Sequence, residues 1–354
     1  MSITDLKRLL PADKEFRRNL AFVYAVLAVL NFGGWAWAIA LFHDQPALIG
    51  VAVLVYGLGL RHAVDADHIA AIDNVTRKLL QERQQPVAVG FWFAIGHSTV
   101  VILVTAVVVA ATGNLKAFDA YREAGGAFST IVSAVFLLVV AGMNLAIFAT
   151  IVRTLKRMRA GEAIDDGALD LMFAGRGPMS RLFRPLFRSI GRAWHMAPLG
   201  FLFGLSFDTA TEVTLFGLSA TQAGRGVPIE AALVFPVLFA AGMSLLDTTD
   251  GVMMVGAYRW AFVKPLRKLY YNLTITLMSI AVAVFIGGVE IAALAVRRLG
   301  LQGPLADWAL TLNENFNALG FAIIALFAAA WALSFLIVRA AERSPPPPAA
   351  LGTP

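Results

Sequence analysis

The chain has 354 residues, of which 58% are hydrophobic and only 15% are charged. Soluble domains carry about 25% charged residues, so this composition indicates a polytopic membrane protein and excludes an ordinary soluble domain. The net charge of +6 does not indicate a nucleic-acid partner, because the basic residues fall in loops between apolar runs, and the absence of cysteine excludes disulfides and thiolate metal sites.

Eight apolar runs are each long enough to cross a hydrocarbon core of roughly 30 Å. They cover residues 20–42, 47–70, 87–112, 127–151, 198–222, 229–256, 270–296 and 309–338. We therefore predict an all-α polytopic membrane protein with eight transmembrane helices. A single transmembrane domain is expected over 1–343, followed by a disordered proline-rich tail over 344–354. The stretch 1–18 is polar and charged, so we expect no cleavable signal.

Lysine and arginine concentrate in every second connection, including the one between the second and third helices, which holds Arg77, Lys78 and Arg83. Such residues favour the cytoplasmic side. We therefore expect both termini and the long basic connection 152–197 to be cytoplasmic, in a multi-pass protein of the inner membrane. The arginines of 181–192 alternate with Leu and Phe, which fits either a surface helix on anionic lipid or a basic loop with no further role.

The most polar stretch within an apolar run is 61–68, which reads RHAVDADH. A charged side chain deep in a membrane costs at least about 2.5–3.5 kcal/mol, so such residues by default mark a functional site. At about 100° per residue, His62, Asp65 and His68 share one face of a regular helix, whereas Asp67 points away. Two imidazoles and a carboxylate suit Ni, Co, Zn or Fe.

Asp67 reaches that face only if the helix is distorted near Gly57 and Gly59. Otherwise Asp67 orients a histidine or binds a neighbouring helix. The alternative to a metal site is a structural ion-pair network of Arg61 with Asp65 and Asp67.

Other polar side chains lie at similar depth in the first, third, fifth and sixth predicted helices. The candidate metal ligands are His62, Asp65, Asp67, His68, His97, Asn31, Asp208, Glu212, Asp247 and Asp250. Arg61 is the single arginine among these acids, so a site of low dielectric must bind cations, take up protons, or do both. Because the acids outnumber this arginine, we also hypothesise that metal movement is coupled to proton movement.

The middle of the chain contains an internal repeat. Gly59-Leu60 recurs as Gly204-Leu205, 145 residues further on, and the sequence FAIGHS of 93–98 recurs as FAAGMS of 239–244. This offset relates the second to fourth predicted helices to the fifth to seventh. An odd number of helices in each unit gives the two units opposite orientations, and inverted repeats of this kind build secondary transporters with a site near the midplane.

These motifs resemble the nickel/cobalt transporter family, whose members have eight helices and a signature His-x4-Asp-His in the second. Here the signature is His62, Asp67 and His68, so the resemblance names Asp67 where regular helical geometry favours Asp65. The resemblance extends to 96–101 (GHSTVV), 207–212 (FDTATE) and 242–250 (GMSLLDTTD). It implies high-affinity import of Ni²⁺, possibly also Co²⁺, with the metal as substrate and no cofactor. Many members have a histidine where this chain has Asn31, so the metal preference of this chain is open.

Two other classes remain open. An intramembrane metal-dependent hydrolase is one, although the motifs His-Glu-x-x-His and Gly-x-Ser-x-Gly are missing. A divalent metal exporter is the other, although 152–197 contains only His195 to gather metal. A Walker A sequence is also missing, so ATP is not expected to drive transport from this chain alone, and no ATPase partner is evident. The expected partners are a divalent transition-metal ion and the lipid bilayer, and we predict a transporter and not an enzyme.

Overall fold

A computed structural model describes residues 14–82, 84–110, 190–205, 210–261 and 265–343, together with 127, 130–142, 144, 145, 148, 149, 152 and 153. Regular structure within these residues is entirely helical, which confirms the predicted all-α class. The tail 344–354, most of the connection 152–197 and Asp208 lie outside the described residues. The named helices are α2 (Lys14–Phe42), α3 (Pro46–His62), α4 (Ala66–Gln81), α5 (Val89–Ala110), the 3-10 helix η1 (Ala193–His195), α9 (Met196–Gly204), α10 (Ala210–Gly224), α11 (Ile229–Ala232), α12 (Val234–Ala261), α13 (Pro265–Leu299), α14 (Pro304–Glu314) and α15 (Phe316–Arg343).

Four stretches of the described chain are single helices long and apolar enough to cross a membrane. They are Lys14–Phe42, Val89–Ala110, Ile229–Tyr258 and Thr276–Leu299. Two helix pairs pass the same test only together: α3 with α4, bent by 52°, and α14 with α15, bent by 72°. By length and composition the described part of the chain therefore has four candidate spans, or six if each bent pair counts as one, as expected of a membrane protein.

Two of the runs predicted as continuous helices are interrupted within the described residues. The run 47–70 breaks at 63–65, where Asp65 adopts an extended backbone (φ −65°, ψ 143°) ahead of α4. The run 309–338 is divided between α14 and α15, whereas 206–209 of the run 198–222 lie outside the described residues. The prediction of one continuous helix over 309–338 is wrong, and for 47–70 the distorted alternative is the one present, with the break at 63–65 and not at Gly57 and Gly59. Apolar composition measures span length and does not register a local break in the hydrogen-bond ladder.

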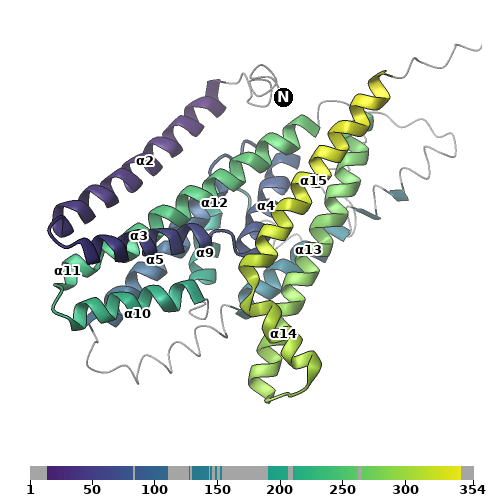
Figure 1. Cartoon of the computed structure of the whole chain (residues 1–354). Coiled ribbons are helices and arrows are strands. Elements are labelled where there is room, and N and C mark those ends of the chain that lie inside the picture. Colours follow the sequence, from purple (N-terminus) through teal and green to yellow (C-terminus); the bar gives the residue numbers. More distant parts are fainter. Residues whose placement is uncertain are drawn as a thin grey trace, which may run out of the picture.

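Helix α12 is the central element of the arrangement (Figure 1). It packs against α3, α5, α4 and α2, while α9 packs along α5. Helices α13 and α15 contact each other and α4, and α14 joins them at one end (Figure 1). Helix α4 of the broken pair is thereby held between α12 on one side and α13 with α15 on the other, while α3 packs on α12, α10 and α2.

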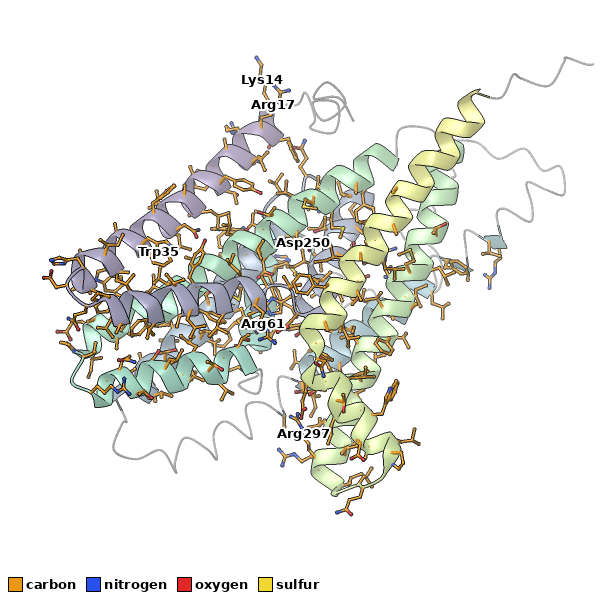
Figure 2. All side chains as sticks on the ribbon, viewed as in Figure 1. Lys14, Arg17, Trp35, Arg61, Asp250 and Arg297 are labelled. Atoms are coloured by element: carbon orange, nitrogen blue, oxygen red, sulfur yellow. The ribbon has the colours of Figure 1, made fainter. Side chains whose placement is uncertain are left out.

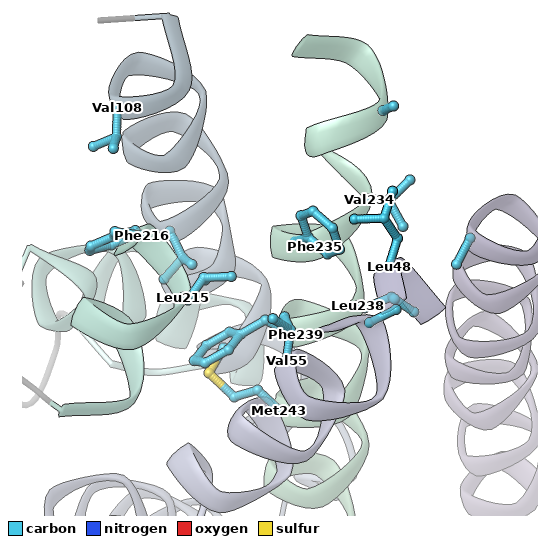
Figure 3. Close-up of a cluster of buried hydrophobic side chains, with 14 of the residues drawn as sticks. Leu48, Val55, Val108, Leu215, Phe216, Val234, Phe235, Leu238, Phe239 and Met243 are labelled. Atoms are coloured by element: carbon cyan, nitrogen blue, oxygen red, sulfur yellow. The ribbon is translucent and has the colours of Figure 1, made fainter. Parts of the chain in front are cut away.

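A buried apolar cluster fixes α12 against its neighbours (Figure 3). Phe235 of α12 stacks on Phe42 of α2 with ring centroids 5.7 Å apart. Gly59 of α3 allows a close approach, because a Cβ atom there would lie only 2.1 Å from the carbonyl oxygen of Phe239. Small residues of this kind let the backbones of membrane helices meet directly. This contact holds the end of α3, and therefore His62, against α12.

Arg77 and Lys78 do not belong to a loop, as the sequence predicted, but to α4, where both are buried. The guanidinium of Arg77 donates to Thr276 Oγ1 of α13 at 2.9 Å and to Asn74 Oδ1 at 3.2 Å. Asn144 also donates to Asn74 Oδ1, at 2.7 Å. The assignment was wrong because a cluster of basic residues after an apolar run is typical of a cytoplasmic loop, whereas here polar partners on other helices surround Arg77.

Candidate metal centre

The break between α3 and α4 brings two histidines and an aspartate together. His62 is the last residue of α3, Asp65 lies in the break, and His68 lies in the first turn of α4. His62 Nδ1 is 3.0 Å from Asp65 Oδ2, and the rings of His62 and His68 have centroids 4.7 Å apart. All three side chains are buried. The predicted grouping of these three residues is therefore present, although it arises from a 52° bend and not from a regular helix.

His97 of α5 completes a cluster of three imidazoles. Its Nε2 lies 3.0 Å from Nε2 of His62, and its ring centroid is 4.8 Å from that of His68. One ligand atom of each histidine lies within 4.8 Å of those of the other two. Gly96, the neighbouring residue, permits this placement, since a Cβ there would lie 1.9 Å from the carbonyl oxygen of Ala197 on α9.

Side-chain oxygens from two further helices surround the imidazoles. Glu212, in the first turn of α10, places Oε1 3.0 Å from His97 Nε2 and 3.8 Å from His62 Nε2. Thr211 Oγ1 lies 3.0 Å from His62 Nδ1. Asp247 of α12 places Oδ1 3.3 Å from His68 Nδ1. Glu212 and Asp247 are both 0% exposed. The cluster thus joins α3, α4, α5, α10 and α12, and it offers imidazole nitrogens together with carboxylate oxygens, the donor set suited to a divalent transition metal.

The remaining candidate ligands are less directly placed. Asp67 lies in the first turn of α4, is partly exposed, and interacts electrostatically with His68, Asp65 and His62. Asn31 of α2 accepts a hydrogen bond from the Tyr56 hydroxyl at 2.9 Å. Its amide nitrogen donates to the carbonyl oxygens of Leu27 and Ala241.

Asp250 lies one helical turn beyond Asp247 on α12, and its described electrostatic neighbours are Asp73 and Asp247. Asp208 lies outside the described residues. Arg61, expected to be the arginine among the acids, is on the exposed side of α3, and within the described part of the chain the buried arginine is Arg77.

Sequence reasoning missed the polar group next to the histidines on α4. Asp73 is 0% exposed, accepts a hydrogen bond from the Tyr258 hydroxyl, and accepts another from Ser279 Oγ at 3.1 Å. The available signal was the spacing of Asp73 and Arg77, which are four residues apart and so lie on one face of a helix that continues past the histidine motif.

Comparison with known proteins agrees with this donor set. Residues 48–337 match the model of the NicO family, described as high-affinity nickel-transport protein. The chain is 50% identical to the high-affinity nickel transport protein of Cupriavidus necator, over 91% of this chain and 92% of that protein. It is 50% identical to the hydrogenase nickel incorporation protein HupN of Bradyrhizobium diazoefficiens, over 90% and 84%. It is 43% identical to the nickel transporter NicT of Mycobacterium tuberculosis, over 97% and 95%. No solved structure matches. The chain belongs to the NicO family of high-affinity nickel-transport proteins, which are transporters and not enzymes.

Proposed function

We propose that this protein imports Ni²⁺ across the inner membrane as a secondary transporter, and that the imidazoles of His62, His68 and His97 bind the ion within the membrane. The observation that carries the proposal is the meeting of three buried histidines, with ligand atoms within 4.8 Å of one another, in a chain 50% identical to a high-affinity nickel transport protein. Buried ionisable groups inside a membrane are expensive and are retained for function.

The spacing of the imidazole nitrogens suits a metal ion with tetragonal coordination geometry. Imidazole nitrogens bind such metals at about 2.0–2.1 Å, so two nitrogens 3.0 Å apart, as in His62 and His97, subtend roughly a right angle at an ion between them. Tetragonal arrangements of nitrogen and oxygen ligands are preferred by Ni(II) and Cu(II). Glu212 supplies negative charge on the same side, because its Oε1 is 3.0 Å from His97 Nε2. Co²⁺ is the second candidate substrate, since imidazole and carboxylate also suit it.

The assignment of the two aspartates follows from the break in the helix. We propose that Asp65 either binds the ion itself or orients the ring of His62, because its Oδ2 lies 3.0 Å from His62 Nδ1. Asp67 is proposed to act on His68 and His62 through its charge, with Asp247 holding His68 by the contact at 3.3 Å. Asp208 and Asn31 keep their predicted roles as ligands, and Asn31 is tested below.

Eight spans arranged as an inverted repeat remain our proposal for the membrane topology, with both termini and 152–197 in the cytoplasm. Two crosswise contacts support the repeat. Gly59 meets the backbone of Phe239, and Gly200 meets the backbone of Phe93, with a Cβ atom at 2.1 and 2.0 Å from the respective carbonyl oxygens. Phe93 and Phe239 are equivalent positions of the repeated sequence, whereas Gly200 lies one helical turn before Gly204, the residue that the repeat equates with Gly59. The match between the α3–α12 and α9–α5 packings therefore holds for the helices and not residue by residue. An odd number of helices in each unit requires opposite orientations.

The two alternative functions have less support. The relatives named above carry names of nickel transport or nickel incorporation, and none is named as a hydrolase or an exporter. The deciding experiment is uptake of radioactive ⁶³Ni²⁺ into right-side-out membrane vesicles, with Co²⁺, Zn²⁺ or Mn²⁺ as competitor and with or without a proton gradient. We expect inward accumulation that Co²⁺ inhibits more than Mn²⁺ does. Accumulation only in inverted vesicles would identify an exporter, and none in either orientation would contradict transport.

A further inference from the structure

A second group of acids extends from the histidine cluster along α12 and α4, in which Asp73 and Asp247 are 0% exposed and Asp250 is half-buried. Asp247 uses Oδ1 for its contact with His68, whereas its Oδ2 has no hydrogen-bond partner among the described residues although the side chain is 0% exposed. Asp250, three residues on, lies about 4.5 Å further along the helix axis. Its Oδ2 is also buried without a described partner. Two buried carboxylate oxygens therefore follow each other on α12, where Figure 2 labels Asp250.

The negative charge of the neighbouring Asp73 is compensated by its surroundings, whereas the negative charge of Asp250 is not. Asp73 accepts hydrogen bonds from the hydroxyls of Tyr258 and Ser279, and Arg77 attracts it electrostatically. Arg77 is itself held by Thr276 at 2.9 Å. The electrostatic neighbours described for Asp250 are Asp73 and Asp247, both of which are acids. Negative charge at Asp250 is thus opposed by its surroundings instead of being balanced by them.

Charged groups removed from water are strongly destabilising unless an opposite charge or hydrogen-bond donors replace the lost solvation. We propose that Asp250 and the unpartnered oxygen of Asp247 form a second cation position, which receives the transported divalent ion after it leaves the histidine centre. This inference rests on the proposed function. The position offers carboxylate oxygens only, and such ligands hold Ni²⁺ less tightly than imidazoles do, so it suits release and not capture.

The position of Asp247 supports a transfer between the two sites. It contacts His68 with one oxygen and is left with the other for an ion on the side of Asp250. An ion moving one helical turn along α12 therefore exchanges imidazole for carboxylate ligands without passing through a region of uncompensated positive charge. The buried arginine of this region, Arg77, is directed to Thr276 and Asn74.

The test compares Asp250→Asn, which matches a protonated aspartate in shape, with Asp250→Glu, which keeps the carboxylate. Asp307→Asn is the matched control, because Asp307 is an exposed acid of α14. The measurements are the initial rate of ⁶³Ni²⁺ uptake by cells, normalised to protein in the membrane, and equilibrium binding of ⁶³Ni²⁺ to the purified full chain. We expect Asp250→Asn to lower uptake at least about tenfold while the Kd of the tight site stays within about twofold, and Asp250→Glu to restore a large part of the rate.

Uptake by Asp250→Asn within about twofold of the unaltered protein would overturn the proposal, since it would show that a neutral Asp250 suffices. Loss of tight binding together with uptake would also overturn it, because Asp250 would then belong to the histidine centre. If Asp250→Asn does not accumulate in the membrane, Asp250→Ser is judged by the same criteria. Failure of the proposed function is recognised separately, by tight Ni²⁺ binding that survives replacement of His62 and His68.

Discussion

Nε2 of His62 lies 3.0 Å from Nε2 of His97, although the two residues come from different helices and are 35 positions apart in the chain. Two ring nitrogens at this distance cannot both carry a proton toward the other, so one must accept, or both must face a metal ion. His62 also has Asp65 Oδ2 3.0 Å from its other nitrogen. A carboxylate on the far side of a ligating histidine fixes its ring and raises its basicity.

Replacing either histidine of the α3–α4 break tests the centre directly. We expect His62→Ala and His68→Ala each to reduce ⁶³Ni²⁺ uptake by at least about a hundredfold, because a lost imidazole also leaves a buried carboxylate without its partner. His43→Ala is the control, since His43 is exposed and pairs with Asp44. Uptake is measured at equal amounts of protein in the membrane. Normal uptake by either cluster variant would refute the metal centre.

Asn31 tests whether α2 contributes to metal selectivity. A histidine at this position adds a softer ligand, so we expect Asn31→His to broaden the range of competing metals toward Co²⁺. The same substitution removes the hydrogen bonds of the amide to Leu27 and Ala241. Tyr56→Phe is therefore the matched control, because it breaks only the 2.9 Å bond from the Tyr56 hydroxyl to Asn31.

The measurement is inhibition of ⁶³Ni²⁺ uptake by Co²⁺, Zn²⁺ and Mn²⁺ in each variant. An unchanged profile in Asn31→His would remove Asn31 from the selectivity site. Equal changes in both variants would mean that Asn31 acts through the packing of α2 on α3.

Helix α15 supports the break that carries the centre, through a contact of its Gly320. A Cβ atom on Gly320 would lie 1.6 Å from the carbonyl oxygen of Val64 and 3.2 Å from Cδ1 of Ile69. Gly320→Ala must therefore displace the break or α15. We expect a loss of about 1–3 kcal/mol in the free energy of unfolding, as for other overpacked sites, together with a marked loss of uptake.

Gly288→Ala is the control for Gly320→Ala, since no heavy atom lies within 4 Å of a Cβ built at Gly288 of α13. Thermal unfolding in detergent and ⁶³Ni²⁺ uptake are measured for both. Equal stability and uptake in the two variants would show that α15 does not restrain the break.

Arg77 is predicted to be a structural residue of the transporter. Removing one partner of a buried charged group costs about 3–5 kcal/mol, so we expect Arg77→Ala to destabilise the protein by an amount of that order. The reason is that Asp73 would lose its cation while remaining 0% exposed. Arg297→Ala changes an exposed arginine of α13 and should alter stability by no more than about 0.5 kcal/mol. Comparable unfolding midpoints for the two variants would contradict this account.

The amino-acid sequence by itself determined the class of the protein and the chemistry of the centre. Apolar runs can be recognised from composition alone because a membrane helix must satisfy its own backbone hydrogen bonds and face lipid. Imidazoles and acids inside such runs are conspicuous because they are costly there. His62, Asp65, His68, His97 and Glu212 were all predicted in this way, and the structure brings them together.

The tertiary structure alone decided how those residues meet and which others join them. Gly57 and Gly59 left a distorted helix open as an alternative, but the break lies at 63–65, where contacts from distant residues hold it, such as Gly320 on Val64 and Phe239 on Gly59. The same holds for Arg77, which the sequence alone placed in a loop and the structure places in α4, beside Thr276 of α13. Contacts between residues far apart in the chain depend on how the helices pack, and helical periodicity carries no information about which faces meet.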